Sequence, residues 1–445
     1  MDAPYNVAEE TSWWPLDAAA VIKLLVALCG PPFVFTVTSK YSTIRYAAAP
    51  FMMWLHWDIF SHHYPSRLML WSFVLGSMAT TPFNWLRLLI ITPVDMNDLA
   101  IMFKAPAETL LQKLYILYKV TSTPRWINTP WETKNTPPFP KYYTRRHMKL
   151  PSRGSFLLRQ SCILFWQLLI LNLAECAGNL QASQVENLGE PKKFSWNHST
   201  EKWIELIISN VIAWLLCARC LIDSHYRALS VLHVGILGDD VADWPPLFGT
   251  MLDSYTLRNF WGKFWHQSLR SSFTAVSNRF CRELLRLPRP SVLERYTNVF
   301  IVFLLSGTLH LALDYGSGLP TEVSGALFFF TAFTFGYMVE DGVQALWKRM
   351  FPLHESTHGN KETGTPRWQK IVGAIWVMLW LGVTSGPYLA PTMDLPPAIL
   401  GPIPANIEVG FGPLIGFILV VGALIAYVFR GRALSLPFLA GEVLH

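Results

Sequence analysis

The residue best placed to do chemistry is His310, which lies inside a long apolar run, Thr297–Asp314. An ionisable side chain at such a depth of a bilayer is expected to face protein or water, not lipid. A histidine there can act as a general base on a bound hydroxyl. It can also bond neighbouring helices together for stability alone, and the residue by itself leaves both interpretations open.

The neighbours of His310 bear on this choice. Ser306, Gly307 and Thr308 precede it, and their small side chains would let another group approach closely, which favours a lined cavity. Asp314 follows one helical turn later on the same face. It could fix the tautomer of the imidazole, but its position at the end of the run favours a role as a helix cap.

A polar, tryptophan-rich segment, Tyr255–Arg270, precedes this run and reads YTLRNFWGKFWHQSLR. At helical spacing it carries an apolar and aromatic face, which comprises Phe260, Trp261, Phe264, Trp265 and Leu269. Lys263, His266 and Arg270 are interspersed. The pattern alone favours an amphipathic interfacial helix whose aromatic rings sit at the level of the lipid headgroups.

Two other groups of polar residues resemble metal or redox sites. Asp239, Asp240 and Asp243 could bind a divalent cation, but their spacing matches no metal-binding loop, and a solvated acidic turn is favoured. Cys217 and Cys220 have C-x-x-C spacing on an expected membrane helix, where buried, small apolar side chains are the favoured interpretation. We therefore predict no metal site. Signatures of ATPases and common hydrolases are also absent from the sequence.

The composition is that of a membrane protein that crosses the bilayer several times. Hydrophobic residues make up 51% of the 445 residues and charged residues only 15%, against about 25% charged residues in soluble domains. The net charge of +6 fits basic cytoplasmic loops, and no basic run has a nucleic-acid-binding pattern. The sequence therefore predicts an all-α integral membrane protein, a single membrane domain over residues 1–445.

A membrane helix needs about 20 mostly apolar residues. By this measure the chain has about nine expected spans, namely Ala18–Ser39, Ile44–Phe60, Leu68–Thr92, Gln160–Ala177, Trp203–Ile222, Thr297–Asp314, Val323–Trp347, Ile371–Tyr388 and Val409–Phe429. Ser230–Leu237 is apolar but too short to span, and we expect a re-entrant piece or a surface helix there.

The charges of the loops predict the orientation, because lysine and arginine gather on the cytoplasmic side. Residues 94–159 form a basic loop and are expected in the cytoplasm, as are Asp223–Tyr296 and the C-terminus. The N-terminus is then luminal, and the membrane is expected to be that of the endoplasmic reticulum. The luminal stretch Gly178–Lys202 would carry a glycosylation sequon at Asn197. Two amphipathic helices are expected in the cytoplasmic loops, Ala105–Leu117 and Leu269–Leu287, and Thr121–Pro140 is expected to be irregular.

Two stretches resemble the membrane-bound O-acyltransferase superfamily, specifically its wax-synthase-like branch. That branch carries an F-W-G-x-x-W-[NH] box, which here is Phe260–His266, and a histidine in a following membrane helix, here His310 after Ser306-Gly307. Trp244–Gly249, WPPLFG, also resembles this branch, so residues 239–315 are expected to be the catalytic region. Related boxes often have Asn at the position of His266; a histidine can still donate a hydrogen bond there, but it can also titrate.

The resemblance implies an enzyme that transfers an acyl group from acyl-CoA to a hydroxyl group, without a bound cofactor or metal. His310 would be the general base, and His266 would orient the donor or stabilise the oxyanion. Lys263 and Arg270 would meet the phosphates of CoA, and Trp261, Trp265 and Ser306 would complete the substrate site. The WPPLFG stretch and the FWGKFWHQ form resemble fungal O-acetyltransferases of terpenoid and meroterpenoid pathways, which implies acetyl-CoA as donor and a lipophilic alcohol as acceptor.

Three other functions stay open at this point. A long-chain wax ester synthase would share the same motifs. A transporter would use His310 and Asp314 in a proton path, but it would predict further intramembrane charges in matching halves and an inverted repeat. The sequence shows neither, and Lys23 and Arg87 are the only basic residues well inside the expected spans. A non-catalytic membrane scaffold of the same fold is the third alternative.

Overall fold

The computed structural model describes residues 18–62, 76, 80–123, 125–140, 150–182, 190–351 and 365–395. Within these ranges every regular element is helical, as the composition predicts. The longer helices are α1 (Ala18–Val37), α2 (Thr43–His62), α4 (Met96–Phe103), α5 (Leu110–Ser122), α7 (Arg153–Ala182), α8 (Thr200–Ile212), α9 (Arg219–Leu232), α11 (Arg270–Arg279), α12 (Val292–Gly316), α13 (Ala326–Met350), α14 (Arg367–Thr384) and α15 (Gly386–Met393). The short helical turns are η1 (Arg87–Ile91), η2 (Ala213–Ala218), η3 (His233–Leu237), η4 (Val241–Asp243), η5 (Met251–Asp253), α10 (Leu257–Asn259), η6 (Phe260–Phe264) and η7 (Phe280–Leu284).

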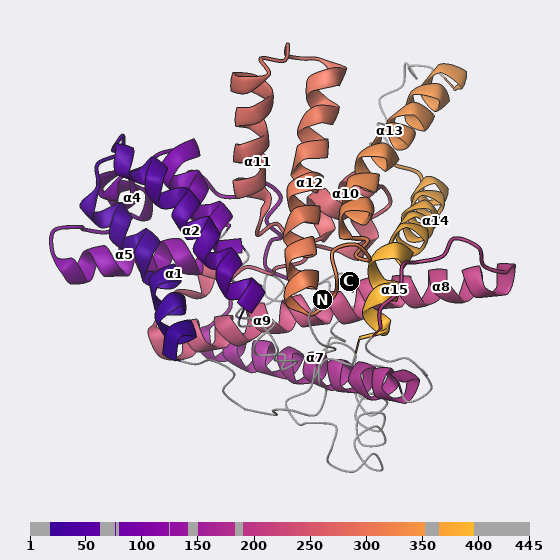
Figure 1. The fold of residues 1–445 in the computed structure, drawn as a ribbon, viewed down its shortest axis with the longest axis horizontal. Helices are drawn as coiled ribbons and strands as arrows, with labels where there is room; N and C mark the ends of the chain where they lie inside the picture. Colours follow the sequence, from indigo (N-terminus) through magenta and orange to yellow (C-terminus); the bar gives the residue numbers. More distant parts are fainter. Residues whose placement is uncertain are drawn as a thin grey trace.

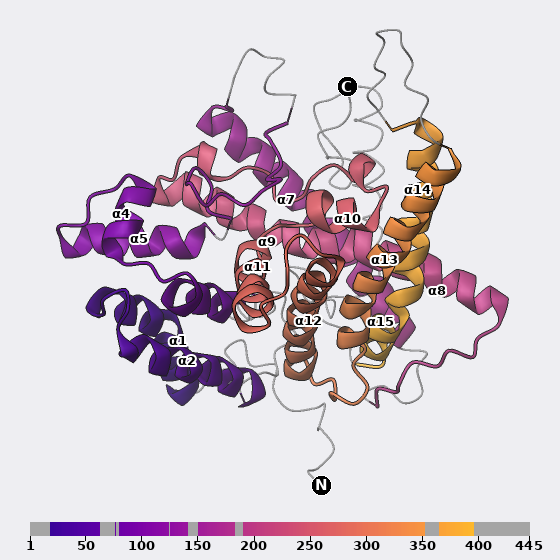
Figure 2. The same cartoon turned by 90° about the horizontal axis from the view of Figure 1, so that it is seen from above.

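The helices form two groups around a central hairpin. α12 and α13 run side by side as this hairpin, with α11 next to α12 and α14 next to α13 (Figure 1). α8 and α9 form one long rod that lies beside α7 and crosses below the hairpin (Figure 1). α1, α2, α4 and α5 gather at the other side of the molecule (Figure 2).

Two large hydrophobic cores lie within these groups, and a smaller cluster joins α1 and α2 to α11 and α12 around Leu55 and Phe273. The larger core is aromatic and lies where α12 and α13 meet η2 and η6, with Trp214, Phe260 and Phe333 among its buried side chains. The second core packs α1 and η1 against α4 and α5, around Leu88 and Trp126. The predicted basic loop, residues 94–159, therefore folds on the helices beside it where it is described.

Three helices are long and apolar enough to cross a membrane in the described part of the chain: Arg153–Gly178, Thr200–Leu237 and Val292–Gly316. A fourth crossing results if Arg367–Thr384 and Gly386–Met393, bent by 48°, count as one span. The predicted span Val409–Phe429 and part of Leu68–Thr92, residues 68–75 and 77–79, lie outside the described residues. The count of about nine membrane helices therefore stays a prediction.

Three predicted boundaries differ from the structure. The helix expected over Trp203–Ile222 continues through two π-helical turns to Leu237, so Ser230–Leu237 extends that rod and is not a separate piece. α5 begins only at Leu110 because Thr109 caps it: its side chain accepts from the Gln112 N–H, and the Gln112 side chain accepts in return. The helix expected over Leu269–Leu287 is present as α11 and η7.

Candidate active site

The tryptophan-rich segment does not form the interfacial helix that its spacing favours. It folds as the short turn α10, the π-helical turn η6, and an extended residue at Trp265. Phe260 and Phe264 are fully buried, and Trp265 is 4% exposed. The reason is tertiary packing: these rings fill the aromatic core beside α12 and α13, since Trp261 lies 5.7 Å from Phe303 and 5.0 Å from Phe333 between ring centroids. The segment therefore enters the protein instead of lying on its surface.

Two buried polar side chains hold the ends of this segment. At its start, Glu340 of α13 accepts from the Leu257 N–H at 2.5 Å and from the Trp376 Nε1–H at 3.0 Å. At its end, the Gln267 amide donates to the carbonyls of Trp261 and Trp265 at 2.8 and 2.5 Å. Sequence reasoning missed both residues, although a carboxylate inside an expected membrane span was a signal for Glu340.

His310 projects from α12 into the aromatic core. Its ring centroid lies 4.2 Å from that of Phe330 and 6.0 Å from that of Tyr388. Its Nδ1 lies 2.8 Å from the Ser306 carbonyl oxygen, one turn back along the helix. Because a carbonyl only accepts, this bond requires the proton on Nδ1 and leaves a lone pair on Nε2. The tautomer is the one that a general base needs.

Asp314 does not share in this arrangement. It is buried and accepts from the Ser324 hydroxyl at 2.5 Å, in the connection between α12 and α13. The bond to the Ser306 carbonyl, and not Asp314, thus sets the tautomer of His310. Asp314 ties the end of α12 to the chain that follows through this bond, and the C-cap position of the helix is Ser317.

His266 lies at the inner end of the tryptophan-rich segment, beside Phe248 and Trp265. Its Nδ1 is buried and has no hydrogen-bond partner. Burial is the main cause that lowers the pKa of His266 to about 3, and repulsion from His310 and Arg125 adds to it. His266 is therefore neutral at physiological pH, and it lies close enough to His310 for their charges to interact.

Two indole N–H groups whose rings lie near Phe330 also lack partners. Trp261 of the segment and Trp214 of η2 each have a buried Nε1 without a hydrogen bond. Their rings lie 6.0 and 6.4 Å from that of Phe330, the ring that packs against His310. Unsatisfied buried donors are costly unless a ligand supplies the acceptor. Trp214 lies outside both recognised stretches, and no local pattern in the sequence pointed to it.

The remaining predicted site residues take different positions. Lys263 is exposed, so its ammonium is accessible to a ligand. Arg270 is half-buried and donates to the Gly262 carbonyl at 3.2 Å and to the Gln267 side chain at 2.9 Å. Ser306 meets His310 through its backbone carbonyl. The structure thus brings Trp261, Trp265, His266, Ser306 and His310 to one core, with the two cations beside it.

Residues 244–332 match the model of the membrane bound O-acyl transferase family. An acetyltransferase of Aspergillus fumigatus, spyB, is 34% identical over 424 residues, which cover 90% of this chain and 69% of that protein. The chain belongs to the membrane bound O-acyl transferase family. A second acetyltransferase, atnC of an Arthrinium species, is 37% identical over 85% of this chain and 88% of its own length. A third acetyltransferase, TRI7 of Fusarium sporotrichioides, is 33% identical over 84% of this chain and 86% of its own length.

Membership makes this protein a membrane O-acyltransferase. The matched residues 244–332 include the WPPLFG loop, the tryptophan-rich segment and His310, which are the parts that meet in the aromatic core. The relatives' shared name, acetyltransferase, also argues against the transporter and scaffold alternatives.

The WPPLFG loop of this acyltransferase packs directly on the tryptophan-rich segment. The Gly249 N–H donates to the Phe264 carbonyl at 2.9 Å. A Cβ at Gly249 would lie 2.2 Å from the carbonyl oxygen of Lys263, which is closer than any contact that atoms tolerate. Only glycine therefore allows the two backbones to meet at this point.

Replacing Gly249 with alanine should displace the segment and lower both stability and acyl transfer. Overpacking of this kind costs about 1–3 kcal/mol when a side chain can yield, and here the clash is with backbone. Thermal unfolding and acyl transfer of the purified variant measure the effect. Gly154→Ala is the matched control, because a Cβ there meets nothing within 4 Å. Equal stability and activity of the two variants would contradict the predicted close packing.

An arginine from the basic loop holds the two prolines of the WPPLFG loop. Arg125 is 2% exposed, and its guanidinium donates to the carbonyls of Pro245 and Pro246, both at 2.6 Å. It also donates to the Tyr226 hydroxyl at 2.6 Å, and that hydroxyl in turn donates to the Pro245 carbonyl. The charge pattern of the sequence predicts only that Arg125 lies on the cytoplasmic side. Its contacts with the WPPLFG loop result from the fold and have no local signal in the sequence.

The sequence favours a solvated acidic turn before the loop, but two of its three carboxylates, Asp239 and Asp243, form ion pairs with Lys119 in the structure. Asp239 is buried and bonds Lys119 at 3.1 Å, His233 at 3.2 Å and the Trp244 indole at 3.2 Å. Asp243 bonds the same lysine at 2.6 Å. Burial acts to raise the pKa of Asp239, but its bonds to His233 and Lys119 outweigh this and lower that pKa to about 2. No group of three or more His, Cys, Asp or Glu in the described residues is arranged to hold a metal ion.

The ion pair of Asp239 should make stability depend on pH in a defined window. The pKa of its carboxyl is lowered to about 2 from an ordinary value of 3.8. This shift corresponds to roughly 2 kcal/mol of folding stability. This contribution is fully present above about pH 4 and is lost as the pH falls through about 2.

The melting temperature of Asp239→Asn should therefore lie below that of the wild type from neutral pH down to about pH 5, and the gap should narrow below pH 4. Asp240→Asn is the control, because this exposed neighbour only accepts from the Ala242 N–H. A difference in melting temperature between wild type and Asp239→Asn that stays constant down to pH 3 would show that the carboxylate charge does not contribute to stability.

Proposed function

We propose that this acyltransferase transfers the acetyl group of acetyl-CoA to a hydroxyl of a lipophilic acceptor, of the terpenoid or meroterpenoid class. The observation that carries the proposal is the position of His310, a histidine with its proton held on Nδ1 inside an aromatic core within the family-matched region. The names of the relatives support acetyl as the group transferred. Long-chain wax ester synthesis is the alternative that shares the same motifs.

The mechanism follows from the groups that surround His310. Nε2 of His310 takes the proton of the acceptor hydroxyl as its oxygen attacks the thioester carbonyl of acetyl-CoA. The carbonyl oxygen becomes an oxyanion, to which the unpartnered nitrogens of Trp261 and His266 can donate. The C–S bond then breaks, and the proton on His310 passes to the CoA thiolate. The products are the acetyl ester and free CoA, so no acyl-enzyme, metal or redox partner is required.

Neutral His266 can supply this hydrogen bond only in one tautomer, in which the nitrogen facing the oxyanion carries the proton. Its low pKa removes the cost of a second positive charge beside His310 when the latter becomes protonated. Exposed Lys263 is placed to meet a CoA phosphate. Arg270 holds the Gly262 carbonyl and we assign it to the same phosphates through its remaining N–H groups.

A direct assay separates acetyl transfer from wax ester synthesis. The purified protein in lipid nanodiscs is given radiolabelled acetyl-CoA or palmitoyl-CoA with a terpenoid alcohol or a long-chain fatty alcohol. The proposal expects a labelled acetyl ester of the terpenoid alcohol and little product from palmitoyl-CoA. A palmitoyl ester of the fatty alcohol as the main product would overturn it.

We also propose a location in the endoplasmic reticulum, with about nine spans, a luminal N-terminus and a cytoplasmic C-terminus. The basic residues of the region 94–159 support this orientation. Asn197 is exposed beside the start of α8 and is accessible to glycosylation. Sensitivity to endoglycosidase H that disappears in Asn197→Gln would place this stretch in the lumen; modification of engineered sequons in residues 94–159 would contradict the orientation.

A further inference from the structure

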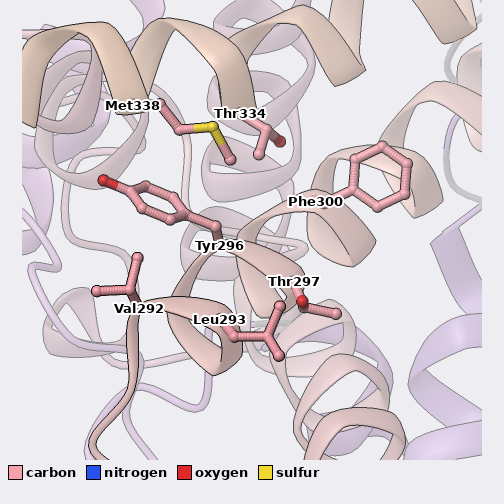
Figure 3. A pocket seen from close by; sticks show the side chains of 7 residues that line it. All are labelled: Val292, Leu293, Tyr296, Thr297, Phe300, Thr334 and Met338. Carbon is pink, nitrogen blue, oxygen red and sulfur yellow. The ribbon is translucent and has the colours of Figure 1, made fainter.

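An apolar groove lies between α12 and α13, on the face shown in Figure 3. The two helices meet closely at Gly307, where a Cβ would lie 3.2 Å from the Cα of Leu327. From that contact they diverge toward the start of α12 (Figure 1). The space that opens has a volume of about 530 Å³ and is lined by Val292, Leu293, Tyr296, Thr297, Phe300, Thr334 and Met338.

One polar atom in the wall of the groove has no partner. Thr334 is 5% exposed, and its Oγ1 is buried without a hydrogen bond. The half-buried hydroxyl of Tyr296 nearby is engaged, because it donates to Asp341 at 2.8 Å. A threonine in a helix usually bonds its hydroxyl to a carbonyl one turn back, as Thr331 does with Leu327 at 2.6 Å. The hydroxyl of Thr334 is thus an unsatisfied donor in the wall of the groove.

The groove adjoins the candidate active site. Thr334 lies one helical turn from Phe330 on α13, and the Phe330 ring packs against His310 at 4.2 Å between centroids. At its other end the groove opens onto an apolar surface, where Val292 and Leu293 are 71% and 62% exposed. A molecule in the groove would therefore lie about one helical turn along α13 from Phe330, whose ring packs against His310.

We propose that this groove binds the apolar skeleton of the acceptor alcohol and that the Thr334 hydroxyl bonds a polar group on it; the inference rests on the proposed acetyl transfer. Acetyl-CoA has no chain long enough to fill such a space, and its polar, charged CoA moiety does not suit apolar walls. The acceptor is the large apolar reactant. A volume of about 530 Å³ is within the range of small-molecule sites, roughly 300–1,000 Å³.

Substitutions in the groove test the proposal through the two Michaelis constants. Leu293→Trp fills the groove, and Thr334→Val removes the hydroxyl at constant volume. Each should raise KM for the acceptor roughly tenfold and leave KM for acetyl-CoA unchanged. Thr334→Ser should restore the wild-type value, and Val343→Trp, on the exposed opposite face of α13, should have no effect. A rise in KM for acetyl-CoA instead, or no change in either constant, would overturn the proposal.

A labelling experiment separates failure of the groove from failure of the function. The His310→Ala variant is irradiated with a terpenoid alcohol that carries a diazirine, and the labelled peptides are mapped. The proposal expects label on residues 292–300 and 334–338, reduced by excess unmodified alcohol. Label elsewhere while the wild type transfers acetyl groups overturns the groove alone. If the wild type acetylates no alcohol but the groove is labelled, the proposed function fails and the binding site stands.

Discussion

Replacing His310 with alanine should lower acetyl transfer by about 10²–10⁴-fold, which is the usual contribution of a general base. The hydroxyl of an alcohol is a poor nucleophile until its proton is removed, and Nε2 of His310 is the basic atom that the Ser306 carbonyl leaves in the correct tautomer. No other histidine among the described residues combines this bond with a position beside Phe330 in the family-matched region. The measurement is label transfer from acetyl-CoA by equal amounts of purified wild type and variant.

The chain offers a matched control for this substitution. His56 of α2 is 2% exposed, and its Nδ1 bonds the Met52 carbonyl one turn back, at 2.6 Å. His56→Ala removes the same side chain from the same kind of helical setting, but away from the aromatic core. It should retain acetyl transfer within a few-fold per folded molecule. Comparable loss in both variants would mean that buried histidines act here through stability alone.

The second large effect is expected for Arg125→Ala. The substitution removes three hydrogen bonds from a buried guanidinium, to Pro245, Pro246 and Tyr226. Hydrogen bonds to charged groups contribute about 1.5–3 kcal/mol each, and the two carbonyls would be left without their charged donor. We expect destabilisation of at least about 3 kcal/mol. Acetyl transfer should fall as well, because the WPPLFG loop packs on the segment that carries His266 through Gly249.

Thermal unfolding of the detergent-solubilised protein measures this effect, and the melting temperature should fall by at least about 3 °C. Arg125→Lys should recover only part of the loss, since one ammonium cannot match the fork of the guanidinium. Arg153→Ala is the control, because that exposed arginine makes a single bond to the Gly235 carbonyl. An Arg125→Ala variant as stable as the control would show that the loop is held by other contacts.

The helices and the central histidine could be predicted from the sequence because their signals are local. The apolar run Thr297–Asp314 predicts most of α12, and a lone histidine in such a run marks a site wherever it lies. The capping box of Thr109 and Gln112 is also a local signal, and it predicts that α5 begins at Leu110.

The path of the tryptophan-rich segment could not be predicted in this way. Its helical spacing favoured an amphipathic helix, but partners far along the chain, such as Trp214 and Phe333, bury its rings. The bond between Asp239 and Lys119 joins residues 120 positions apart, so no local pattern distinguishes it from a solvated carboxylate. The same holds for Arg125, whose acceptors lie in a distant loop.

The central claim is that the tryptophan-rich segment and α12 form one catalytic site, in which His266 and His310 act in the same step. A double-mutant cycle tests this most directly, with acetyl-transfer rates measured for wild type, His266→Ala, His310→Ala and the double variant. If the two residues act together, the double variant should be about as slow as His310→Ala alone, because His266 has no transition state to stabilise once the base is absent. Independent effects that multiply in the double variant would contradict a shared site.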